Sequence, residues 1–444
     1  MSSKASVRFV MTAAIAAFFL VLSFLSSSAF ADSQVRVVRL SEVQGDVKID
    51  RNLGQGYEKA FLNLPITQGV KLQTKSDGRA EVEFEDGSTL RITPDTVVEF
   101  PQLSLRDSGS KVSTVHLQEG IVYLNFTGAK DSELTLTFAH EKLPLTRAAH
   151  LRIDLADVTA TLAVFKGDVQ VEGDSGTVAV SKNRTATFDL SADDHSTIAK
   201  DLEADPFDAW DKQQDQYHQQ YASNAYSGYS PYAYGTGDLN YYGSFFNAPG
   251  YGTMWQPFFA GAGWDPFMNG AWAFSPGLGY GWVSGYPWGW TPYHYGTWAY
   301  LPAYGWAWQP GGSWAAYSAP RILGAPGNFV APQPPTTGQQ TVVVNRGPMP
   351  LQLGRPFNRV EIAKNSAGLG IPRGGIKNLS QLSSTVQQKG FATARIHTAA
   401  AGNASWGRGF AEAGSPWGAG HGGSASGSAV SGGHSSAGHS SGHR

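Results

Sequence analysis

Cysteine is absent from this 444-residue sequence, which excludes disulfide bonds and lipid attachment at a cysteine. The sequence also lacks a phosphate-binding loop and a His-Glu-x-x-His motif. Apart from one run near its start, no stretch is long and apolar enough to span a membrane. We therefore expect a non-enzymatic protein with no catalytic residue, no cofactor and no metal centre, held together by packing alone.

The first 31 residues have the pattern of a secretory signal peptide. Lys4 and Arg8 precede an apolar run over 9–25, and Ala29 and Ala31 are small residues at the two positions that signal peptidase reads. The pattern predicts cleavage after Ala31 and export to the periplasm, the cell envelope or the medium. The alternative is an uncleaved anchor, which would be the only contact with a membrane, although the run is shorter than the roughly 20 residues that span a bilayer.

Charge is scarce in the middle of the chain and unevenly distributed elsewhere. Residues 32–226 hold 20 basic and 31 acidic side chains, 227–320 hold only Asp238 and Asp265, and 321–444 hold 11 basic and 2 acidic ones. The two ends could attract each other, or the basic end could bind anionic envelope polymers, or the sparse charges could merely keep a flexible tail in solution. No dense basic patch is interleaved with aromatic residues, so we expect no binding to nucleic acid.

Residues 35–195 alternate as expected for an all-β domain with many short strands. In the segment 80–84, Ala80 and Val82 alternate with glutamates, which puts one face of the strand on a core and the other in solvent. Gly87 follows in a predicted hairpin turn, since glycine tolerates a positive φ. The expected strands are 35–40, 47–50, 80–84, 89–93, 115–117, 121–126, 134–138, 151–155, 160–165, 169–172 and 177–180.

Four carboxylates of this segment, Glu81, Glu83, Glu85 and Asp86, are expected on the solvent face. Glu83→Ala should then be nearly silent, whereas Val82→Asp should unfold the domain because it buries an unpaired charge. A glycosidase pair of Glu83 and Asp86 is the alternative, and it would require a cleft and a separation of about 5–9 Å.

Two segments, 64–74 and 78–92, resemble the FecR domain, the extracytoplasmic part of ferric-citrate-type iron signalling regulators. Residues 118–123 and 164–171 resemble its later glycine-centred strand turns, so the resemblance covers roughly 35–190. It implies a fold, not a catalytic activity. In signalling members a cytoplasmic anti-sigma segment and a membrane helix precede this domain, whereas eight residues precede the apolar run here. We therefore expect no direct transcriptional regulation, and the chain is similar to secreted FecR-domain proteins with Trp/Gly-rich tails.

A linker helix is predicted over 205–223. Asp205 is a suitable N-cap and Pro206 suits the first helical position. One side of the helix carries Phe207, Trp210, Gln214, Tyr217 and Tyr221, and the rest carries Asp208, Asp211, Lys212 and Asp215. We expect the aromatic side to dock on the β domain, with a free helix that bridges through solvent as the alternative.

Residues 224–320 form a Trp/Tyr/Gly-rich region in which 264–274 recur as 290–300, an offset of 26 residues. Trp282 maps onto Trp308 at the same offset, and a partial copy begins at Trp255. Such a period indicates a small unit stacked on copies of itself. It superficially resembles the choline- and glucan-binding repeats of bacterial surface proteins, from which the prolines inside the unit and the small number of units depart.

The repeated rings are either a structural core or a glycan-binding face. Trp272 and Trp298 lie in alternating runs that predict strands, so we expect both in the core. Trp264 and Trp290 precede a proline by two residues and are expected to be the exposed pair. With Tyr293, they are the candidate glycan-binding residues, because aromatic faces stack on sugars.

The last segments are a basic linker, 321–398, and a Gly/Ser/His-rich tail, 399–444, that buries too little apolar area to fold. In the linker, 341–344 predicts a strand, and Ile376, Leu379, Leu382 and Val386 predict one helical face that ends at Gly390. The tail histidines, His421, His434, His439 and His443, would make only a weak, flexible metal site.

Three functions remain. The first is an envelope protein whose β domain is a protein-contact or assembly module and whose repeats are structural. The second is a carbohydrate-binding protein that uses the repeats on peptidoglycan or exopolysaccharide. The third is an extracytoplasmic partner in FecR-type signalling. The expected partners are therefore envelope proteins or cell-wall polysaccharide.

Overall fold

The computed structural model describes residues 35–191, 195–221, 232–314, 321–347, 353–354 and 359–395. The expected signal peptide with Ala31 and the expected tail with its histidines lie outside these ranges. Within them, no helix combines the length and the apolar character needed to cross a membrane.

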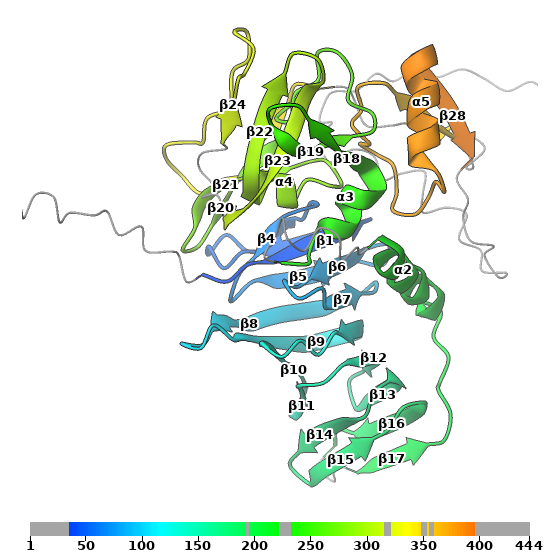
Figure 1. Ribbon diagram of the computed structural model, residues 1–444. Helices are drawn as coiled ribbons and strands as arrows, with labels where there is room; N and C mark the ends of the chain where they lie inside the picture. The colour runs from blue at the N-terminus through cyan, green and yellow to red at the C-terminus, as the bar shows by residue number, and fades with distance from the viewer. Residues whose placement is uncertain are drawn as a thin grey trace, which may run out of the picture.

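The expected all-β domain is confirmed, as 17 strands in two facing sheets that share β9 (Lys111–Phe126) (Figure 1). Sheet A has the order β4 (Pro65–Ile66), β1 (Val38–Gln44), β6 (Arg79–Glu83), β7 (Thr89–Ile92), β9, β12 (Ala149–Leu155), β13 (Thr159–Lys166), β16 (Arg184–Asp189) and β17 (Ser196–Ala199). Sheet B has the order β3 (Glu58–Lys59), β2 (Val47–Asp50), β5 (Lys71–Thr74), β8 (Val97–Leu105), β9, β10 (Ser132–Phe138), β11 (Glu141–Leu145), β14 (Val169–Gly173) and β15 (Gly176–Val180). The buried residues of both sheets form one continuous core, so the domain is a sandwich.

Strand β9 passes from sheet B to sheet A at Gly120. Glu119 pairs with Val97 in sheet B, and Gly120 pairs with Leu155 in sheet A. Gly120 has a φ of +87°, and a Cβ atom there would lie 2.6 Å from the carbonyl oxygen of Asp95, so the crossing requires glycine. The two strands predicted on either side of it are one continuous strand.

The hairpin of β6 and β7 forms as predicted. Glu83 pairs with Thr89, Gly87 in the turn has a φ of +82°, and Val82 is fully buried. Strand β11 was not predicted, because it contains Pro144, which disfavours a strand. Its residues nevertheless alternate between buried and exposed.

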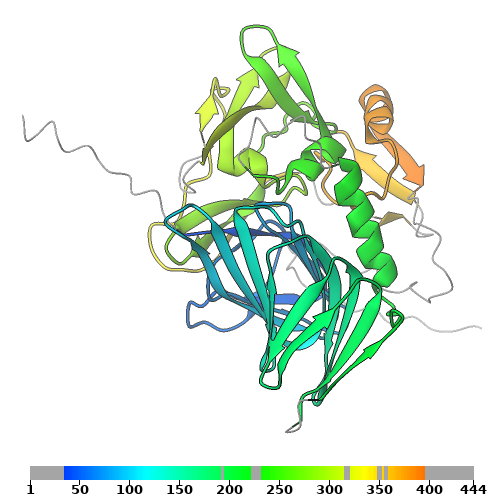
Figure 2. The same cartoon turned by 60° about the horizontal axis from the view of Figure 1, so that its bottom comes forward.

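Helix α2 (Asp208–Tyr221) lies within the predicted linker helix and packs along sheet A, as Figure 2 shows. At its start, Asp205 Oδ1 accepts a hydrogen bond from the Phe207 N–H (2.7 Å), and Asp208 Oδ2 accepts one from the Asp205 N–H (2.9 Å). Trp210 and Tyr217 are buried, so docking is confirmed and the free solvent-bridging helix is wrong.

The Trp-rich region forms an aromatic domain of three hairpins. Its elements are α3 (Thr236–Tyr242), β18 (Gly243–Ala248), β19 (Gly252–Pro257), β20 (Asn269–Ser275), β21 (Gly279–Ser284), α4 (Thr291–His294), β22 (Tyr295–Leu301) and β23 (Gly305–Trp314). Sheet C has the order β18-β19-β23-β22-β24, with β24 at Ile322–Leu323. Sheet D has the order β21-β20-β25, in which β25 (Val342–Asn345) is the strand predicted at 341–344.

The 26-residue repeat corresponds to a hairpin with two opposed tryptophans. Trp272 pairs with Trp282 across β20 and β21, and Trp298 pairs with Trp308 across β22 and β23. The repeat therefore conserves one cross-strand contact, which is the unit of stabilisation in an antiparallel pair.

The partial copy is shifted relative to the others. Trp255 lies on the second strand of its hairpin and pairs with Phe245. It therefore takes the place of Trp308, with which it also shares the following Gln-Pro, and not the place of Trp264.

The rings of this domain pack on one another. Trp272 and Trp298 are buried, as expected, but Trp264 and Trp290 are buried equally well, so the expectation that they are exposed is wrong. The turns that carry them fold inward: the Trp264 indole N–H donates to the Tyr286 hydroxyl (2.9 Å), and Trp290 contacts the Tyr234 ring. A domain with few aliphatic residues fills its core with aromatic rings.

A further small sheet has the order β26 (Leu353–Gly354), β27 (Arg359–Ala363) and β28 (Phe391–Arg395). Helix α5 (Leu379–Lys389) precedes β28 and ends at Gly390, whose φ is +81°, as the sequence predicted. Ile376, Leu379 and Val386 are buried against the aromatic core.

The aromatic domain closes one end of the sandwich. Ala273 and Val283 of the β20–β21 hairpin belong to the core of the sandwich itself. The Asn63 side-chain amide donates to the carbonyl oxygens of Ser284 (3.0 Å) and Tyr286 (2.8 Å). In Figure 1 the aromatic domain covers the end near β1 and β4, and β14–β17 form the opposite end.

We predict that Trp290→Ala lowers the free energy of unfolding by about 3–5 kcal/mol, because it removes a fully buried ring from a packed core. Chemical denaturation followed by tryptophan fluorescence measures it. The control is Tyr304→Ala, at a side chain 45% exposed, which should cost much less. Equal losses from both substitutions would show that the rings are not a packed core.

Candidate functional site

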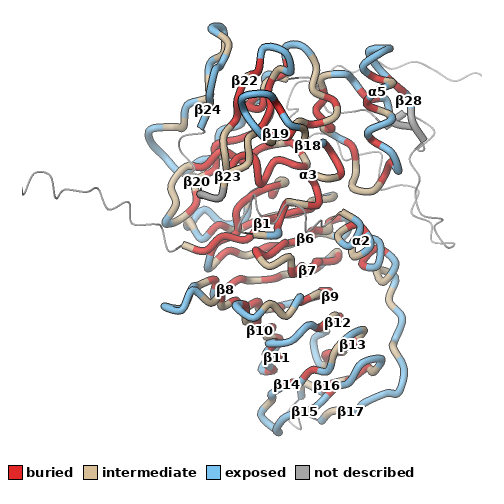
Figure 3. Tube along the Cα trace, viewed as in Figure 1, coloured by how far each residue is buried: buried red, intermediate tan, exposed pale blue. Residues whose placement is uncertain are grey.

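The outward face of sheet A carries a buried network of charged side chains, which we call the ion network. It consists of Arg39, Glu81, Glu83, Arg91, His150, Asp211, Asp215, His218, Asp238 and Arg373. Figure 3 shows the strands that bear it, β1, β6 and β7, as largely buried. The network lies where the sandwich, α2, α3 and the segment before α5 meet.

The sheet contributes cross-strand pairs of opposite charge. Arg39 on β1 lies directly opposite Glu83 on β6, and the two side chains are 3.1 Å apart. Glu81 on β6 lies opposite Arg91 on β7, with 3.0 Å between them. Directly opposed, opposite charges stabilise a strand pair, so these contacts support the pairing of β1, β6 and β7.

Helix α2 contributes a polar ladder along the same face. Its members, Asp208, Asp211, Asp215 and His218, are spaced by three, four and three residues and therefore share one side of the helix. Asp208 pairs with Arg152 (2.7 Å) and accepts a hydrogen bond from the Tyr123 hydroxyl (2.8 Å).

The middle of the ladder meets Arg91, which pairs with Asp211 and with Asp215, the latter at 2.7 Å. Asp215 also accepts a hydrogen bond from the Asn125 amide (3.0 Å). At the end of the ladder, His218 Nε2 lies 2.9 Å from Glu81. The helix is thus held along its length by charge.

Arg373 and Asp238 join the C-terminal part of the chain to this face. Arg373 contacts both oxygens of Asp238, each at 3.0 Å, and its other nitrogen lies 2.7 Å from Glu81. Asp238 in turn lies 2.7 Å from Arg39. The attraction between the acidic and basic ends of the chain, left open by the sequence, is realised in the Arg373–Glu81 contact.

The fixed charges of the ion network do not balance. Three arginines face five carboxylates, and the two remaining members are His150 and His218. A proton on the His218 imidazole, which lies 2.9 Å from Glu81, reduces this excess of negative charge. Docking of α2 is therefore coupled to proton binding at His218.

The shifts in pKa follow these contacts. Burial alone would raise the pKa of Glu81, but His218, Arg373 and Arg91 outweigh it and hold that pKa well below the usual range. Burial alone would lower the pKa of His218, but Glu81 and Glu83 raise it above its ordinary value, against an opposing effect of Arg373. Burial would likewise raise the pKa of Asp238, which Arg373 and Arg39 hold below its usual range.

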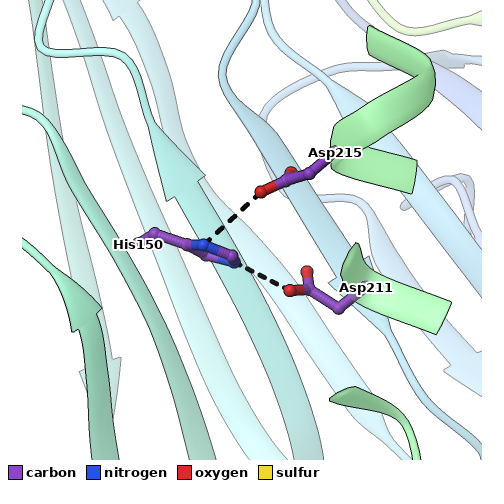
Figure 4. Close-up of side chains that lie close together, drawn as sticks. All are labelled: His150, Asp211 and Asp215. Carbon is purple, nitrogen blue, oxygen red and sulfur yellow. Dashed lines mark ion pairs between the residues drawn. The ribbon is translucent and has the colours of Figure 1, made fainter. Parts of the chain in front are cut away.

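One part of the network has the residue types of a metal site. Ligand atoms of His150, Asp211 and Asp215 all lie within 4.8 Å of one another (Figure 4). However, the guanidinium of Arg91 already contacts both carboxylates and supplies the positive charge that a metal ion would bring. The arrangement therefore fits a buried salt bridge better than a metal centre.

The expected solvent face of β6 is not in solvent. Glu81 and Glu83 are 0% and 4% exposed, and Glu85 is buried too, in an ion pair with Arg36 (2.7 Å). The alternation was interpreted correctly, but α2 and the aromatic domain cover the second face. The expectation that Glu83→Ala is silent is therefore wrong.

Glu83 and Asp86 do not face a common space as a glycosidase pair. Asp86 accepts a hydrogen bond from the Ser88 N–H in the turn, whereas Glu83 contacts Arg39 and the Gly235 N–H.

The three candidate glycan-binding residues lie in two buried clusters: Trp264 and Tyr293 belong to the aromatic core, and Trp290 packs with Tyr234 and Val37. Trp264, Trp290 and Tyr293 are all buried, and the Tyr293 ring is stacked near Trp288 at 6.0 Å. A sugar could stack on these rings only if the core opened.

The sequence contained a signal for the ion network that was not used. Asp208, Asp211 and Asp215 have the spacing of a docking stripe, but docking was expected only for the aromatic side of the helix. Opposite charges at outward positions of adjacent predicted strands, such as Glu81 and Arg91, were the matching half of that signal.

Comparison with known proteins identifies two regions. No curated protein sequence is significantly similar to this chain. Residues 70–170 match the family described as FecR protein. The chain contains a FecR domain. Residues 236–320, most of the aromatic domain, match a family of unknown function, DUF6600.

Two crystal structures, each described as an anti-sigma factor from Parabacteroides distasonis ATCC 8503, are similar to part of the chain. The identities are 15% and 12%, and both TM-scores are 0.27. The similarity covers 32% and 34% of this chain and 63% and 64% of the solved chains, less than two thirds of their length. At this level the likeness carries no argument on function.

We predict that Glu83→Ala lowers the free energy of unfolding by about 3–5 kcal/mol, because it leaves a buried arginine with one counter-charge fewer. Thermal or chemical unfolding measures the loss. Glu99→Ala is the matched control, since Glu99 pairs with Lys71 at the surface of sheet B and its loss should cost less than about 1 kcal/mol. Equal effects of the two substitutions would contradict the ion network.

We further predict that stability falls as the pH rises above about 6.5, the ordinary pKa of histidine. The pKa of His218 is higher in the folded protein, so its stabilising contribution is complete below the unfolded-state value and is lost as the pH passes through the folded-state value. Measured from about pH 5.5 to about pH 9, the melting temperature should decline less steeply in His218→Gln than in the unsubstituted protein. The control is His116→Gln on sheet B, and an unchanged slope in the His218 variant would refute the assignment.

Proposed function

We propose that this protein is a non-enzymatic, exported protein-contact module of the cell envelope, in which the FecR domain binds protein and the DUF6600 region is structural. The observation that supports it best is the ion network. The outward face of the FecR sheet holds a polypeptide segment, the 14-residue helix α2, by matched charges from Asp208 to His218. A sheet that recognises a helix by a ladder of ion pairs is suited to protein contact, because charge patterns give register and specificity.

The chemistry of the site supports a role without catalysis. Glu81 and Asp211, two buried carboxylates of the network, are each paired with an arginine and an imidazole. A general acid or base must reach a substrate, and both groups are buried where α2 packs on the sheet. The FecR domain also favours a place in extracytoplasmic signal transduction, which would use the same contact role.

Carbohydrate binding is the less supported function. The rings that would stack on a sugar, Trp264, Trp290 and Tyr293, are all buried. Structural repeats that bury their own aromatic residues need no ligand to account for their spacing.

We predict that the protein forms protein adducts in the envelope and does not sediment with insoluble cell-wall glycans. A photo-crosslinking amino acid at Val158, an exposed side chain on the FecR domain, should give protease-sensitive adducts in producing cells. The matched control places it at Leu323, exposed on the aromatic domain, where we expect none. Sedimentation with peptidoglycan or exopolysaccharide and absence of protein adducts would together overturn the proposal in favour of glycan binding.

A further inference from the structure

The chain that follows β17 lies along the outward face of sheet A, and we call its residues 201–215 the strap. Figure 1 shows this segment leaving β17 beside the sandwich and continuing into α2. The Thr185 hydroxyl on β16 donates to the Asp201 carbonyl oxygen (2.9 Å) and accepts from the Glu203 N–H (3.0 Å). Arg152 on β12 donates to the Glu203 carbonyl oxygen (2.8 Å). With the contacts of α2 to β9 and β7, the strap crosses most of the sheet.

The strap and the sheet beneath it are complementary in charge. The strap holds six carboxylates and one lysine. The sheet groups that contact these carboxylates are two arginines, an imidazole, a hydroxyl and an amide, namely Arg91, Arg152, His150, Tyr123 and Asn125. Figure 4 shows Asp211 and Asp215 pointing from α2 toward His150. This face therefore recognises carboxylates at a fixed spacing.

The docked strap leaves several polar groups unsatisfied. The Trp210 indole N–H and the Gln214 side-chain oxygen are buried and make no hydrogen bond within the described part of the chain, and the same holds for Nε of Arg152. The Trp210 ring lies over the Arg79 guanidinium, 5.2 Å from it, and not over an apolar side chain of the sheet. Because these groups and charges lose water without full replacement, docking adds little net free energy, and an equivalent segment can replace the strap.

The strap is firmly anchored at one end only. Tyr217, which follows its last carboxylate by two residues, belongs to the aromatic core and donates to Asp238 (2.7 Å). At the other end, the side chains of Asp201 and Glu203 are exposed, and both residues reach the sheet through their backbone. The strap can therefore leave the sheet as far as Asp215 while Tyr217 holds the chain in place.

We propose that the strap is the resident occupant of a protein-binding face. The partner is a protein segment with an acidic helix, whose carboxylates at positions i, i+3 and i+7 replace Asp208, Asp211 and Asp215. The resident strap lowers the apparent affinity for the partner, because only molecules with the strap detached can bind it. This inference rests on the proposed contact role and names the chemistry of the partner.

The test uses a fluorescent peptide of residues 201–216, titrated with the full-length protein and followed by anisotropy. We expect weak binding to the unsubstituted protein. Binding to the double variant Asp208→Asn with Asp211→Asn should be about tenfold tighter, because the resident strap is then weaker while the peptide keeps both carboxylates. Adding Arg152→Gln to the double variant should remove the gain, since the peptide then loses a cation that it binds.

Two controls match this test. The variant Asp107→Asn with Asp174→Asn removes two exposed carboxylates away from the strap and should leave peptide binding unchanged. A peptide of the same composition in scrambled order should bind the double variant more weakly, because its carboxylates lose the spacing of the sheet groups.

Hydrogen exchange on the unsubstituted protein decides the question if the double variant unfolds. The amides of 209–215 should exchange through a local opening, well before those of β9, and an excess of the peptide should accelerate them by keeping the strap off the sheet. A strap that exchanges only when the whole sandwich unfolds would overturn the inference.

Equal peptide binding to the double variant and the unsubstituted protein would also overturn it, as would equal binding of the scrambled peptide. If either result accompanies protein adducts of the Val158 crosslinker, the contact role stands and the displaceable strap is rejected. If the peptide binds as expected but the crosslinker gives no protein adduct, the contact role is rejected, and the partner with it.

Discussion

The salt bridges around Glu81 are the contact on which the arrangement of the whole molecule depends. This one carboxylate lies against Arg91 of its own sheet, His218 of α2 and Arg373 of the C-terminal segment. Three parts of the chain, separated by up to 292 residues, therefore meet at one charge. Removing any partner leaves a buried carboxylate less compensated, so the parts are not independent of one another.

The charged interface between α2 and sheet A specifies the register of the helix, which an apolar interface would not do. Apolar residues at the same positions could give as much stability, but they would not distinguish one register of α2 from another. The spacing of Asp211, Asp215 and His218 matches the positions of Arg91, Asn125 and Glu81 on the sheet, and a slip of one turn would set carboxylate against carboxylate. The network also responds to protons, because the His218 imidazole supplies part of the positive charge that the arginines lack.

Local patterns were enough to predict most of the fold. Alternation located β6, β7 and most other strands of the sandwich, Gly87 located a turn, and the stripe ending at Gly390 located α5. What they could not predict is which faces meet. A strand with charged residues on one side is indistinguishable, in sequence, from one whose charged side is covered by a matching helix, and Glu83 shows that the second case can hold. The covering helix α2 lies more than a hundred residues further along the chain, and a local periodicity carries no information on contacts at that distance.

The aromatic domain also shows that sequence patterns do not reveal which side chains are buried. Its repeat was evident in the sequence, and the pairing of Trp298 with Trp308 explains it physically. The exposure of single rings, however, could not be predicted from their spacing to a proline. With no disulfide and few aliphatic side chains, this domain needs every large ring to exclude water from its interior. The same need explains why it lies over one end of the sandwich: Ala273 and Val283 continue a core that two open sheets would otherwise leave in contact with solvent. A sandwich built by adding hairpins along one direction always has two such ends, and each requires a cap, a partner or a strand edge that discourages pairing.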